Sequence, residues 1–188
     1  HIGHSRNNFI GSSLSEIFSF NGFNVVRMNY MNDWGTHICK SMLMYKKHGD
    51  SAEPNKKSDH FVGDFYTMYE REHEKNSEEL EKELADMFQK MESGDEETLE
   101  LWKKITNWAY EGWKETYENE NVIFDDVEYQ SNYTKAGKDI VALALKKGVA
   151  EKDKTGAIIA KLEKYGLPDK VLLRSDGTPI YITQDTQL

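Results

Sequence analysis

The opening of the chain predicts a helix followed directly by a strand, and this order restricts the fold more than any other feature of the sequence. Residues 5–20 place apolar side chains at the spacings of a helix with one apolar face. Asn21 and Gly22 are residue types that end a helix, and residues 24–29 are a short β-branched run typical of a strand. The apolar stripe consists of Phe9, Ile10, Leu14, Ile17 and Phe18. We therefore expect this helix to pack back onto a sheet.

Two histidines and a glycine stand where this helix begins, in the order His1-Ile2-Gly3-His4. The start of a helix offers unpaired N–H groups and the positive end of the helix dipole, which together bind phosphate. Histidine can donate further hydrogen bonds to phosphate oxygens, and Gly3 lets a ligand approach the backbone closely. The alternative is a pair of solvated histidines near a chain end, which could remain from a tag. These four residues alone favour neither interpretation.

The middle of the chain predicts helices around an aromatic core. A turn at residues 30–36 leads into a helix that fades at residues 46–49, and residues 50–59 form a polar loop. Residues 60–92 and 96–117 then carry apolar side chains at helical spacing. The stripe of the second segment is Leu99, Trp102, Ile105, Trp108, Ala109 and Trp113. We interpret this stripe as core packing, with a ligand cage as the minor alternative.

The last third of the chain predicts strands around one further helix. The helix covers residues 133–147 and ends at Gly148, as a helix with a glycine C-cap does. An Asp176-Gly177 turn between apolar runs indicates a hairpin. The expected strands are residues 121–129, 149–152, 157–162, 170–173 and 179–183.

The composition excludes several classes of protein. The single cysteine, Cys39, cannot form an internal disulfide, and its apolar helical surroundings predict a buried, inert thiol in a reducing compartment. A net charge of −9 argues against a surface that attracts nucleic acid as a whole. No apolar run approaches the length of a membrane span. His73 lies among carboxylates, but without a second histidine at ligand spacing it indicates a helix surface rather than a metal site.

Three patterns follow one another along the chain, and together they resemble a known family. They are His1-Ile-Gly-His4, Asn32-Asp-Trp-Gly-Thr36 and Arg174-Ser-Asp-Gly-Thr-Pro-Ile-Tyr-Ile-Thr-Gln-Asp185. The first resembles the ATP-binding signature of class I aminoacyl-tRNA synthetases, and the other two resemble arginyl-tRNA synthetase in particular. The similarity extends through the helical segments and covers nearly the whole chain.

This resemblance implies an α/β fold: a partial Rossmann-type (class I synthetase, HUP-like) catalytic domain with a mainly helical insertion. Residues 1–49 would be the first part of the catalytic domain, residues 50–165 the insertion with its short strands, and residues 166–188 the return to the catalytic sheet. The family's lysine motif and its anticodon-binding and N-terminal tRNA-contacting domains have no counterpart in these residues. We therefore expect a fragment of a longer enzyme that is inactive by itself.

The resemblance also assigns roles to residues. His1 and His4 would be catalytic, and both would bind ATP together with Gly3. His4 would also reach the arginine substrate, whose side chain would lie against Tyr181 and Asp185. A carboxylate suits this role because it accepts two parallel hydrogen bonds from a guanidinium. From the residues alone, the preferred role of Asp185 is a helix N-cap at the end of the strand, a role that is compatible with ligand binding.

Further expectations concern the wall of the site and the partners. Asn32, Asp33, Trp34 and Gly35 would form an active-site wall at a helix start. The family usually has leucine at the position of Ser5, and this departure would cost helix packing while leaving the histidines' role unchanged. The resemblance implies L-arginine, ATP with Mg²⁺, and tRNA(Arg) as substrates, with no tightly bound metal. It also implies a cytoplasmic monomer that takes part in protein synthesis.

Two other functional classes remain open from the sequence. One is a non-catalytic interaction module derived from a synthetase, which the acidic charge favours more than the motifs do. The other is a generic nucleotide-binding α/β domain. That class accounts for residues 1–4 but leaves the pattern at residues 181–185 unexplained.

Overall fold

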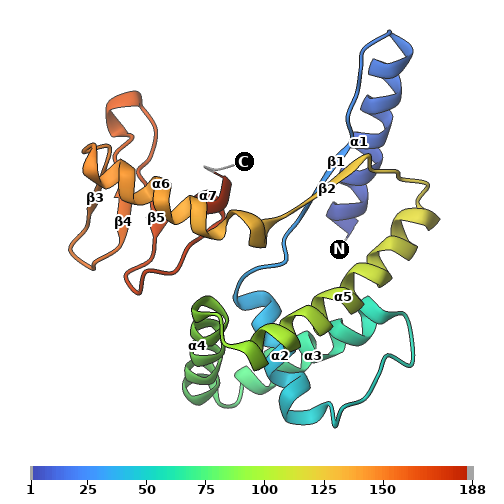
Figure 1. Cartoon of the computed structure of the whole chain (residues 1–188), viewed down its shortest axis with the longest axis horizontal. Helices are drawn as coiled ribbons and strands as arrows, with labels where there is room; N and C mark the ends of the chain where they lie inside the picture. The colour runs from blue at the N-terminus through green and yellow to red at the C-terminus, as the bar shows by residue number, and fades with distance from the viewer. Residues whose placement is uncertain (1, 186–188) are drawn as a thin grey trace. The chain divides into compact units, whose positions relative to one another are not determined.

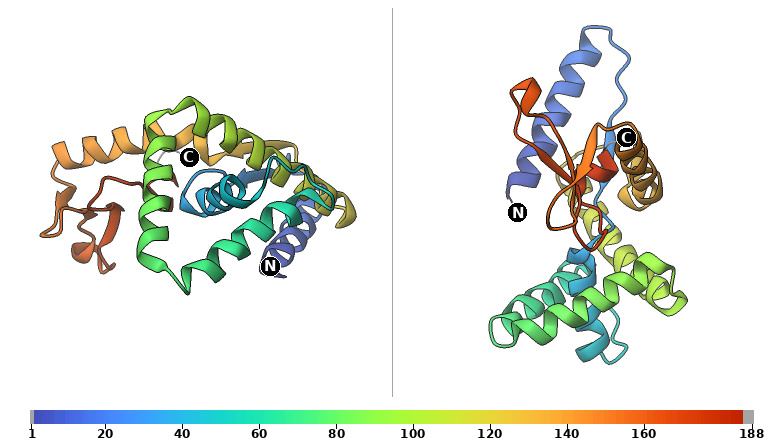
Figure 2. Two further views of the ribbon diagram at one scale, coloured as in Figure 1. Left: turned by 90° about the horizontal axis from the view of Figure 1, so that it is seen from below. Right: turned by 90° about the vertical axis from the view of Figure 1, so that its left-hand side faces the viewer.

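The computed structural model describes residues 2–185, with only the backbone at positions 181 and 184. The helices are α1 (Ile2–Phe20), α2 (Thr36–His48), α3 (Ser58–His73), α4 (Ser77–Ser93), α5 (Glu96–Asn119), α6 (Thr134–Lys146) and α7 (Tyr181–Asp185). The strands are β1 (Met28–Met31), β2 (Asp126–Tyr129), β3 (Ala150–Lys152), β4 (Ile158–Ala160) and β5 (Lys170–Leu173), and two 3₁₀ turns are η1 (Gln130–Tyr133) and η2 (Glu163–Tyr165). Figures 1 and 2 show these elements.

The chain divides into two compact units. The first comprises the residues up to 29 together with residues 33–127, and the second comprises residues 30–32 and those from 128 onward. The first unit therefore holds α1 to α5, and the second holds α6, α7 and the strands β3 to β5.

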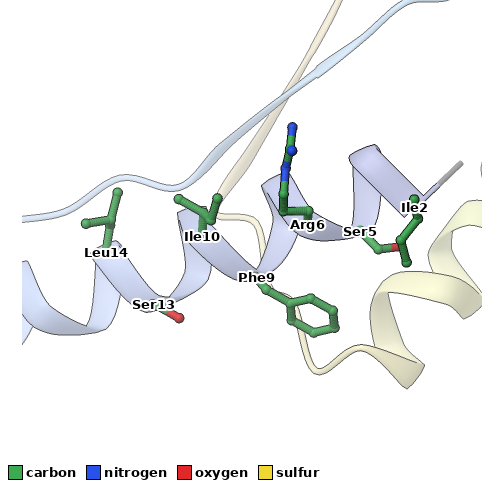
Figure 3. A pocket seen from close by; sticks show the side chains of 7 residues that line it. All are labelled: Ile2, Ser5, Arg6, Phe9, Ile10, Ser13 and Leu14. Atoms are coloured by element: carbon green, nitrogen blue, oxygen red, sulfur yellow. The ribbon is translucent and has the colours of Figure 1, made fainter.

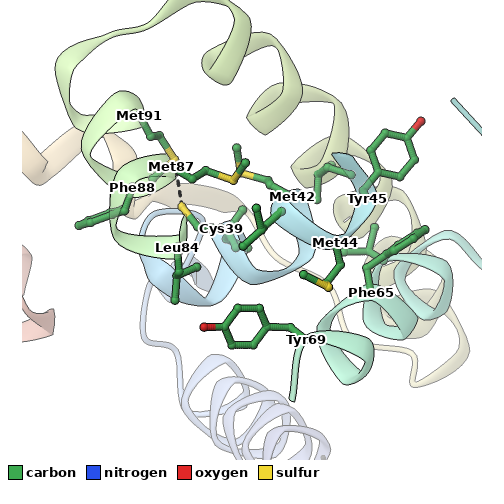
Figure 4. Close-up of a cluster of buried hydrophobic side chains, with 14 of the residues drawn as sticks. Cys39, Met42, Met44, Tyr45, Phe65, Tyr69, Leu84, Met87, Phe88 and Met91 are labelled. Atoms are coloured by element: carbon green, nitrogen blue, oxygen red, sulfur yellow. Dashed lines mark hydrogen bonds between the residues drawn. The ribbon is translucent and has the colours of Figure 1, made fainter. Parts of the chain in front are cut away.

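Helices α2 to α5 enclose the main hydrophobic core. Met42, Met44 and Ile105 have no exposed surface, and Tyr69 is 2% exposed. Figure 4 shows side chains of α2, α3 and α4 converging in this core. The two helical segments predicted at residues 60–92 and 96–117 are separated before α5, where Gly94 adopts a left-handed φ of 82° and the carboxylate of Asp95 accepts the N–H of Thr98 at 3.0 Å.

The aromatic stripe of α5 is core packing, as the spacing predicted. Trp108 packs edge-on against Tyr45 and Phe61, with ring centroids 5.4 and 5.5 Å apart. Edge-to-face pairs at this separation are the favoured geometry of aromatic rings. Ile105 and Ala109, on the same side of the helix, are buried.

Cys39 is confirmed as a buried thiol of this core. Its Sγ atom lies 4.0 Å from the Sδ atom of Met91. Figure 4 marks this contact with a dashed line. Burial, and to a smaller extent the charge of Glu92, raises the pKa of the thiol to about 12. The thiolate is therefore scarce at neutral pH, which makes a nucleophilic role unfavourable.

Helix α1 ends where the sequence predicted, but its stripe is not packed. Phe23 donates its N–H to the carbonyl of Phe18 at 3.1 Å, and Gly22 has a φ of 85°, which together form the expected glycine stop. None of the α1 residues that the structure describes is buried, and the stripe side chains are between 49% and 57% exposed. The expected packing of this helix onto a sheet is therefore absent from residues 2–185.

The first strand begins later than predicted. β1 covers Met28–Met31 rather than residues 24–29, and it pairs with β2 in a two-stranded sheet. Val26 is 63% exposed. Backbone pairing starts at Arg27, whose carbonyl accepts the N–H groups of Asp125 and Asp126. A β-branched run forms a strand only where a partner can pair with it, and in the described residues that partner starts opposite Arg27.

In the second unit, α6 packs on an antiparallel sheet of order β3-β4-β5. Val141 of α6 is 1% exposed and lies in one cluster with Ala150 and Leu172 of the sheet. The helix ends as expected, with Gly148 at a φ of 68°. The strands predicted in residues 149–152, 157–162 and 170–173 are all present, each within the expected range.

The strand predicted at residues 179–183 is wrong. The turn at residues 174–178 forms, and the last residue of β5 makes a single bridge with Pro179. Proline has no N–H to donate to the next rung of a ladder, so pairing stops there. The chain forms α7 instead, and the buried hydroxyl of Thr183 donates a hydrogen bond to the carbonyl of Leu172.

Candidate functional site

The opening motif lies on the first turn of α1. His1 is outside the described residues, while His4 is exposed and Gly3 is half-buried. Two polar side chains near the motif attach this end of the helix to Glu120, which directly follows α5. Hydrogen bonds from Ser5 and Asn8 lower the pKa of that carboxyl, and the Asn8 amide lies 2.7 Å from it. Ser5, the expected departure from the motif, therefore makes a polar contact here.

A largely apolar hollow of about 510 Å³ lies along the first half of α1. Figure 3 shows the side chains that line it. It is lined by Ile2, Ser5, Arg6, Phe9, Ile10, Ser13 and Leu14. The hollow is open, and three of its seven lining residues, Phe9, Ile10 and Leu14, belong to the exposed stripe of the helix. Its chemistry is that of a packing surface, because Arg6 is the single charged side chain in its lining.

The predicted wall begins with a buried turn at the start of α2. Asp33 is 2% exposed, while Trp34 and Gly35 are half-buried. The Trp34 indole donates to Glu92 at 2.6 Å, and the Trp102 indole donates to the carbonyl of Asp33 at 2.8 Å. The turn is therefore bonded to both α4 and α5. Asn32, the fourth residue of the predicted wall, is half-buried and belongs to the second unit.

Gly35 has a backbone conformation that other residues rarely adopt. Its φ is 142°, and a Cβ atom there would lie 3.1 Å from the Nδ1 atom of His37. Glycine is therefore required for α2 to start directly after the turn.

The predicted arginine-binding positions lie on α7. Positions 181 and 185 are four residues apart, so they share one side of the helix, and Asp185 is exposed. Thr183 fixes the helix on β5, and its hydroxyl also accepts the N–H of Ile180 at 3.0 Å. The Thr183 hydroxyl thus joins α7 both to β5 and to the residue just before the helix.

Two buried polar atoms close to α7 in the second unit were not singled out from the sequence. The Oε1 atom of Gln130 and the Oγ1 atom of Thr134 have no hydrogen-bond partner among the residues that the structure describes. Gln130 is 3% exposed, and both η1 and α6 contact α7. A buried acceptor without a partner is costly, so such a group indicates a place where a ligand or water completes the bonding. The available signal was that Gln130 directly follows the end of a predicted strand, where Rossmann-type ligand sites lie.

The structure brings the predicted residues into two groups. His4, Asp33, Trp34 and Gly35 belong to the first unit, whereas Asn32 and positions 181 and 185 belong to the second.

Residues 2–185 contain no group of three or more His, Cys, Asp and Glu side chains that could hold a metal ion. His73, the histidine among carboxylates, ends α3 and bonds Glu81 at 2.8 Å while stacking on Tyr69. Across the described part of the chain, every helix is too short or too polar to cross a membrane.

The family of the chain follows from a match to a known family model. The family model described as tRNA synthetases class I (R), catalytic domain, matches residues 1–187. The chain belongs to this family. Its resemblance to arginyl-tRNA synthetases is thus confirmed over nearly its whole length.

Individual relatives agree with the family. The chain is 46% identical over 195 residues to an arginine–tRNA ligase of Borrelia turicatae (strain 91E135), an alignment that covers 98% of the chain and 33% of the relative. It is 41% identical over 204 residues to the arginine–tRNA ligase of Porphyromonas gingivalis (strain ATCC 33277), covering 98% of the chain and 34% of the relative. The chain thus spans about a third of the length of these curated relatives.

Solved structures show the same fold. The arginyl-tRNA synthetase of Plasmodium falciparum superposes with a TM-score of 0.70 at 19% identity, covering 98% of the chain and 31% of that protein. A putative arginyl-tRNA synthetase from Campylobacter jejuni superposes with a TM-score of 0.61 at 20% identity, covering 98% and 40%. The predicted α/β class, with the catalytic-domain fold of a class I synthetase, is confirmed.

Proposed function

We propose that the full-length gene product is an arginine–tRNA ligase, which activates L-arginine with ATP and transfers it to tRNA(Arg) in protein synthesis. The observation that carries this proposal is the family match over residues 1–187, together with intact motif residues at His1, His4, Tyr181 and Asp185. An interaction module that had lost catalysis would have no need to keep these side chains.

In the proposed reaction, a carboxylate oxygen of arginine attacks the α-phosphorus of ATP. The bond from that phosphorus to its bridging oxygen breaks, and pyrophosphate leaves. A terminal hydroxyl of the tRNA then attacks the carbonyl of the arginyl adenylate, and AMP leaves. Neither step needs a covalent bond to the protein, so positioning and charge stabilisation supply the rate enhancement.

The chain's residues would divide this work between the two substrates. His1, Gly3 and His4 would bind the phosphates of ATP, which enters with Mg²⁺, and His4 would also contact arginine. Asp185 would accept the guanidinium beside Tyr181. We add Gln130 to the proposed arginine site. Its buried side-chain carbonyl oxygen is an acceptor without a partner in the described residues, and a guanidinium offers only donors. Asn32, Asp33, Trp34 and Gly35 would form the wall.

The remaining expectations belong to the same proposal. Residues 1–49 and 166–188 would be parts of the catalytic domain, and residues 50–165 would be its insertion. We also propose that the enzyme is a monomer and acts in the cytoplasm, where tRNA is charged.

The proposal is tested by Asp185→Asn in the full-length gene product. This change keeps the shape of the side chain but removes the charge that would pair with the guanidinium. We expect a loss of about 2–5 kcal/mol in arginine kcat/KM, which corresponds to a factor of roughly thirty or more, with the KM for ATP nearly unchanged. The measurement is arginine-dependent ATP–pyrophosphate exchange with tRNA present.

The matched control is Asp139→Asn, which removes an exposed carboxylate from α6 and should leave both constants unchanged. If Asp185→Asn keeps its arginine constants within about twofold of the parent, Asp185 does not bind the guanidinium. If the parent itself shows no arginine-dependent exchange, the proposed activity is wrong.

A further inference from the structure

The turn at Asp33–Gly35 is held by two indoles that bond in opposite directions. Trp34, which belongs to the turn, donates outward to Glu92 near the end of α4 at 2.6 Å. Trp102, which belongs to α5, donates inward to the carbonyl of Asp33 at 2.8 Å. The two rings lie edge to face with centroids 5.3 Å apart. All of these residues lie in the first unit.

The geometry of this cluster exceeds what hydrophobic packing needs. An indole has one donor and no acceptor, so each tryptophan gives its single hydrogen bond to this arrangement. The Trp34 bond ends on a carboxylate, and bonds to charged acceptors are about twice as strong as neutral ones. Gly35 lies in the turn at a φ of 142°. Because glycine can adopt more backbone conformations than other residues, the turn needs other contacts to fix its conformation. The two bonds select one of these conformations.

We propose that Glu92 and Trp102 are positioning residues for the active-site wall, so that helices α4 and α5 fix the conformation of the Asp33–Gly35 turn. This proposal rests on the proposed function for the meaning of the wall, but its structural part does not. Neither residue has to touch a substrate. Their effect passes through the Asp33 carbonyl and the Trp34 ring to the start of α2.

The test uses the full-length gene product with Trp102→Phe and Glu92→Ala. Phenylalanine keeps an aromatic ring at position 102 but removes the donor, and alanine removes the acceptor of Trp34. We expect amide hydrogen exchange in residues 33–39 to rise by about tenfold in either variant, while exchange around Ile105 stays unchanged. In pyrophosphate exchange we expect kcat to fall several-fold, with the KM for ATP within about twofold.

Two further variants separate positioning from stability. Glu92→Gln keeps an oxygen that accepts the Trp34 N–H. In this variant, amide hydrogen exchange in residues 33–39 and kcat should therefore both stay near the parent values. Trp113→Phe makes the same chemical change on the same helix, away from the turn, and should alter neither. A purely structural role would lower the melting temperature in all the tryptophan variants without a local change at residues 33–39.

Each result decides the proposal. If residues 33–39 exchange at the parent rate in both Trp102→Phe and Glu92→Ala, the turn is not held by these bonds. If amide hydrogen exchange in residues 33–39 rises while kcat stays constant, the bonds hold the turn but the turn does not position the active site, and the proposal fails. If Trp102→Phe does not fold, Glu92→Ala and its glutamine counterpart decide alone. If the parent shows no arginine-dependent pyrophosphate exchange, the proposed function is wrong. The amide hydrogen exchange data still show whether the two bonds hold the turn.

Discussion

Helix α1 and the block of helices α2–α5 carry the same sequence pattern but differ in what covers it. In both regions, apolar side chains recur at spacings of three and four. In the block, Met42, Met44 and Ile105 have no exposed surface, whereas the α1 stripe is about half exposed. Within the first unit, helix α1 is attached to the residues after α5 through polar contacts, including the bond from Asn8 to Glu120. A helical period therefore predicts a helix and its apolar side, but the partner of that side depends on other parts of the molecule.

The largest expected effect is a difference between two truncations. Ile105→Ala should lower the free energy of unfolding of the 188-residue chain by about 2–5 kcal/mol, because it leaves a cavity in the core of the block. Leu14→Ala, on the 49% exposed stripe, should cost no more than about 0.5 kcal/mol. Urea unfolding followed by circular dichroism measures both. Equal losses would show that the α1 stripe is covered in solution.

A matched pair of Gly→Ala substitutions should have opposite signs. A Cβ atom on Gly112 of α5 would lie 2.4 Å from the backbone nitrogen of Asp59, so alanine must push α3 and α5 apart and should cost roughly 1–3 kcal/mol. A Cβ atom on Gly11 of α1 meets nothing within 4 Å. Alanine should stabilise that helix by roughly 0.5–1 kcal/mol. Thermal melts of both variants check the signs, and destabilisation by Gly11→Ala would reveal a neighbour on α1.

The same contrast explains which parts of the fold could be predicted. The helical character of the block and the break before α5 follow from local signals, such as the Gly94-Asp95 pair, whereas the break between α3 and α4 was not predicted within residues 60–92. The start of β1 and the end of the hairpin depend on pairing between distant residues. Val26 has strand propensity without a partner opposite it in the described residues, and Pro179 stops a ladder that the Asp176-Gly177 turn had begun.

The candidate site divides in a similar way. The motif residues can be proposed from the sequence because they form contiguous patterns, as in residues 1–4. The supporting residues leave no such pattern. The sequence predicts Trp102 as one member of a core stripe. Nothing in the sequence shows that its N–H reaches the carbonyl of Asp33, 69 residues away. Gln130 follows the end of a predicted strand, but its burial beside α7 is visible in the structure alone.

The polar attachments near α1 include an ion pair that responds to pH. Arg27 makes a two-pronged contact with Asp125, with nitrogen–oxygen distances of 2.9 and 3.0 Å. Its guanidinium also lies 3.8 Å from Glu16 of α1. The hydrogen bonds from Arg27 lower the pKa of Asp125 to about 2, and those from Ser5 and Asn8 lower the pKa of Glu120. Both carboxylates serve to hold the region of α1.

The smallest effect we expect is a loss of these attachments in acid before the helical block melts. A carboxyl whose pKa is lower in the folded chain stabilises it fully above its ordinary pKa of about 4, and this contribution is lost as the pH falls through the folded value. For Asp125 the loss should therefore run from about pH 4 to about pH 2. Amide hydrogen exchange at Asp125 and Asp126, whose N–H groups bond the carbonyl of Arg27, should accelerate in this interval relative to the intrinsic rate.

The control is Asp125→Asn, which removes the titrating group. Amide hydrogen exchange in this variant should be faster than in the parent at pH 5 and should change less on acidification. If the parent and the variant show the same pH profile, the ion pair does not hold this region, and α1 is attached by contacts of another kind.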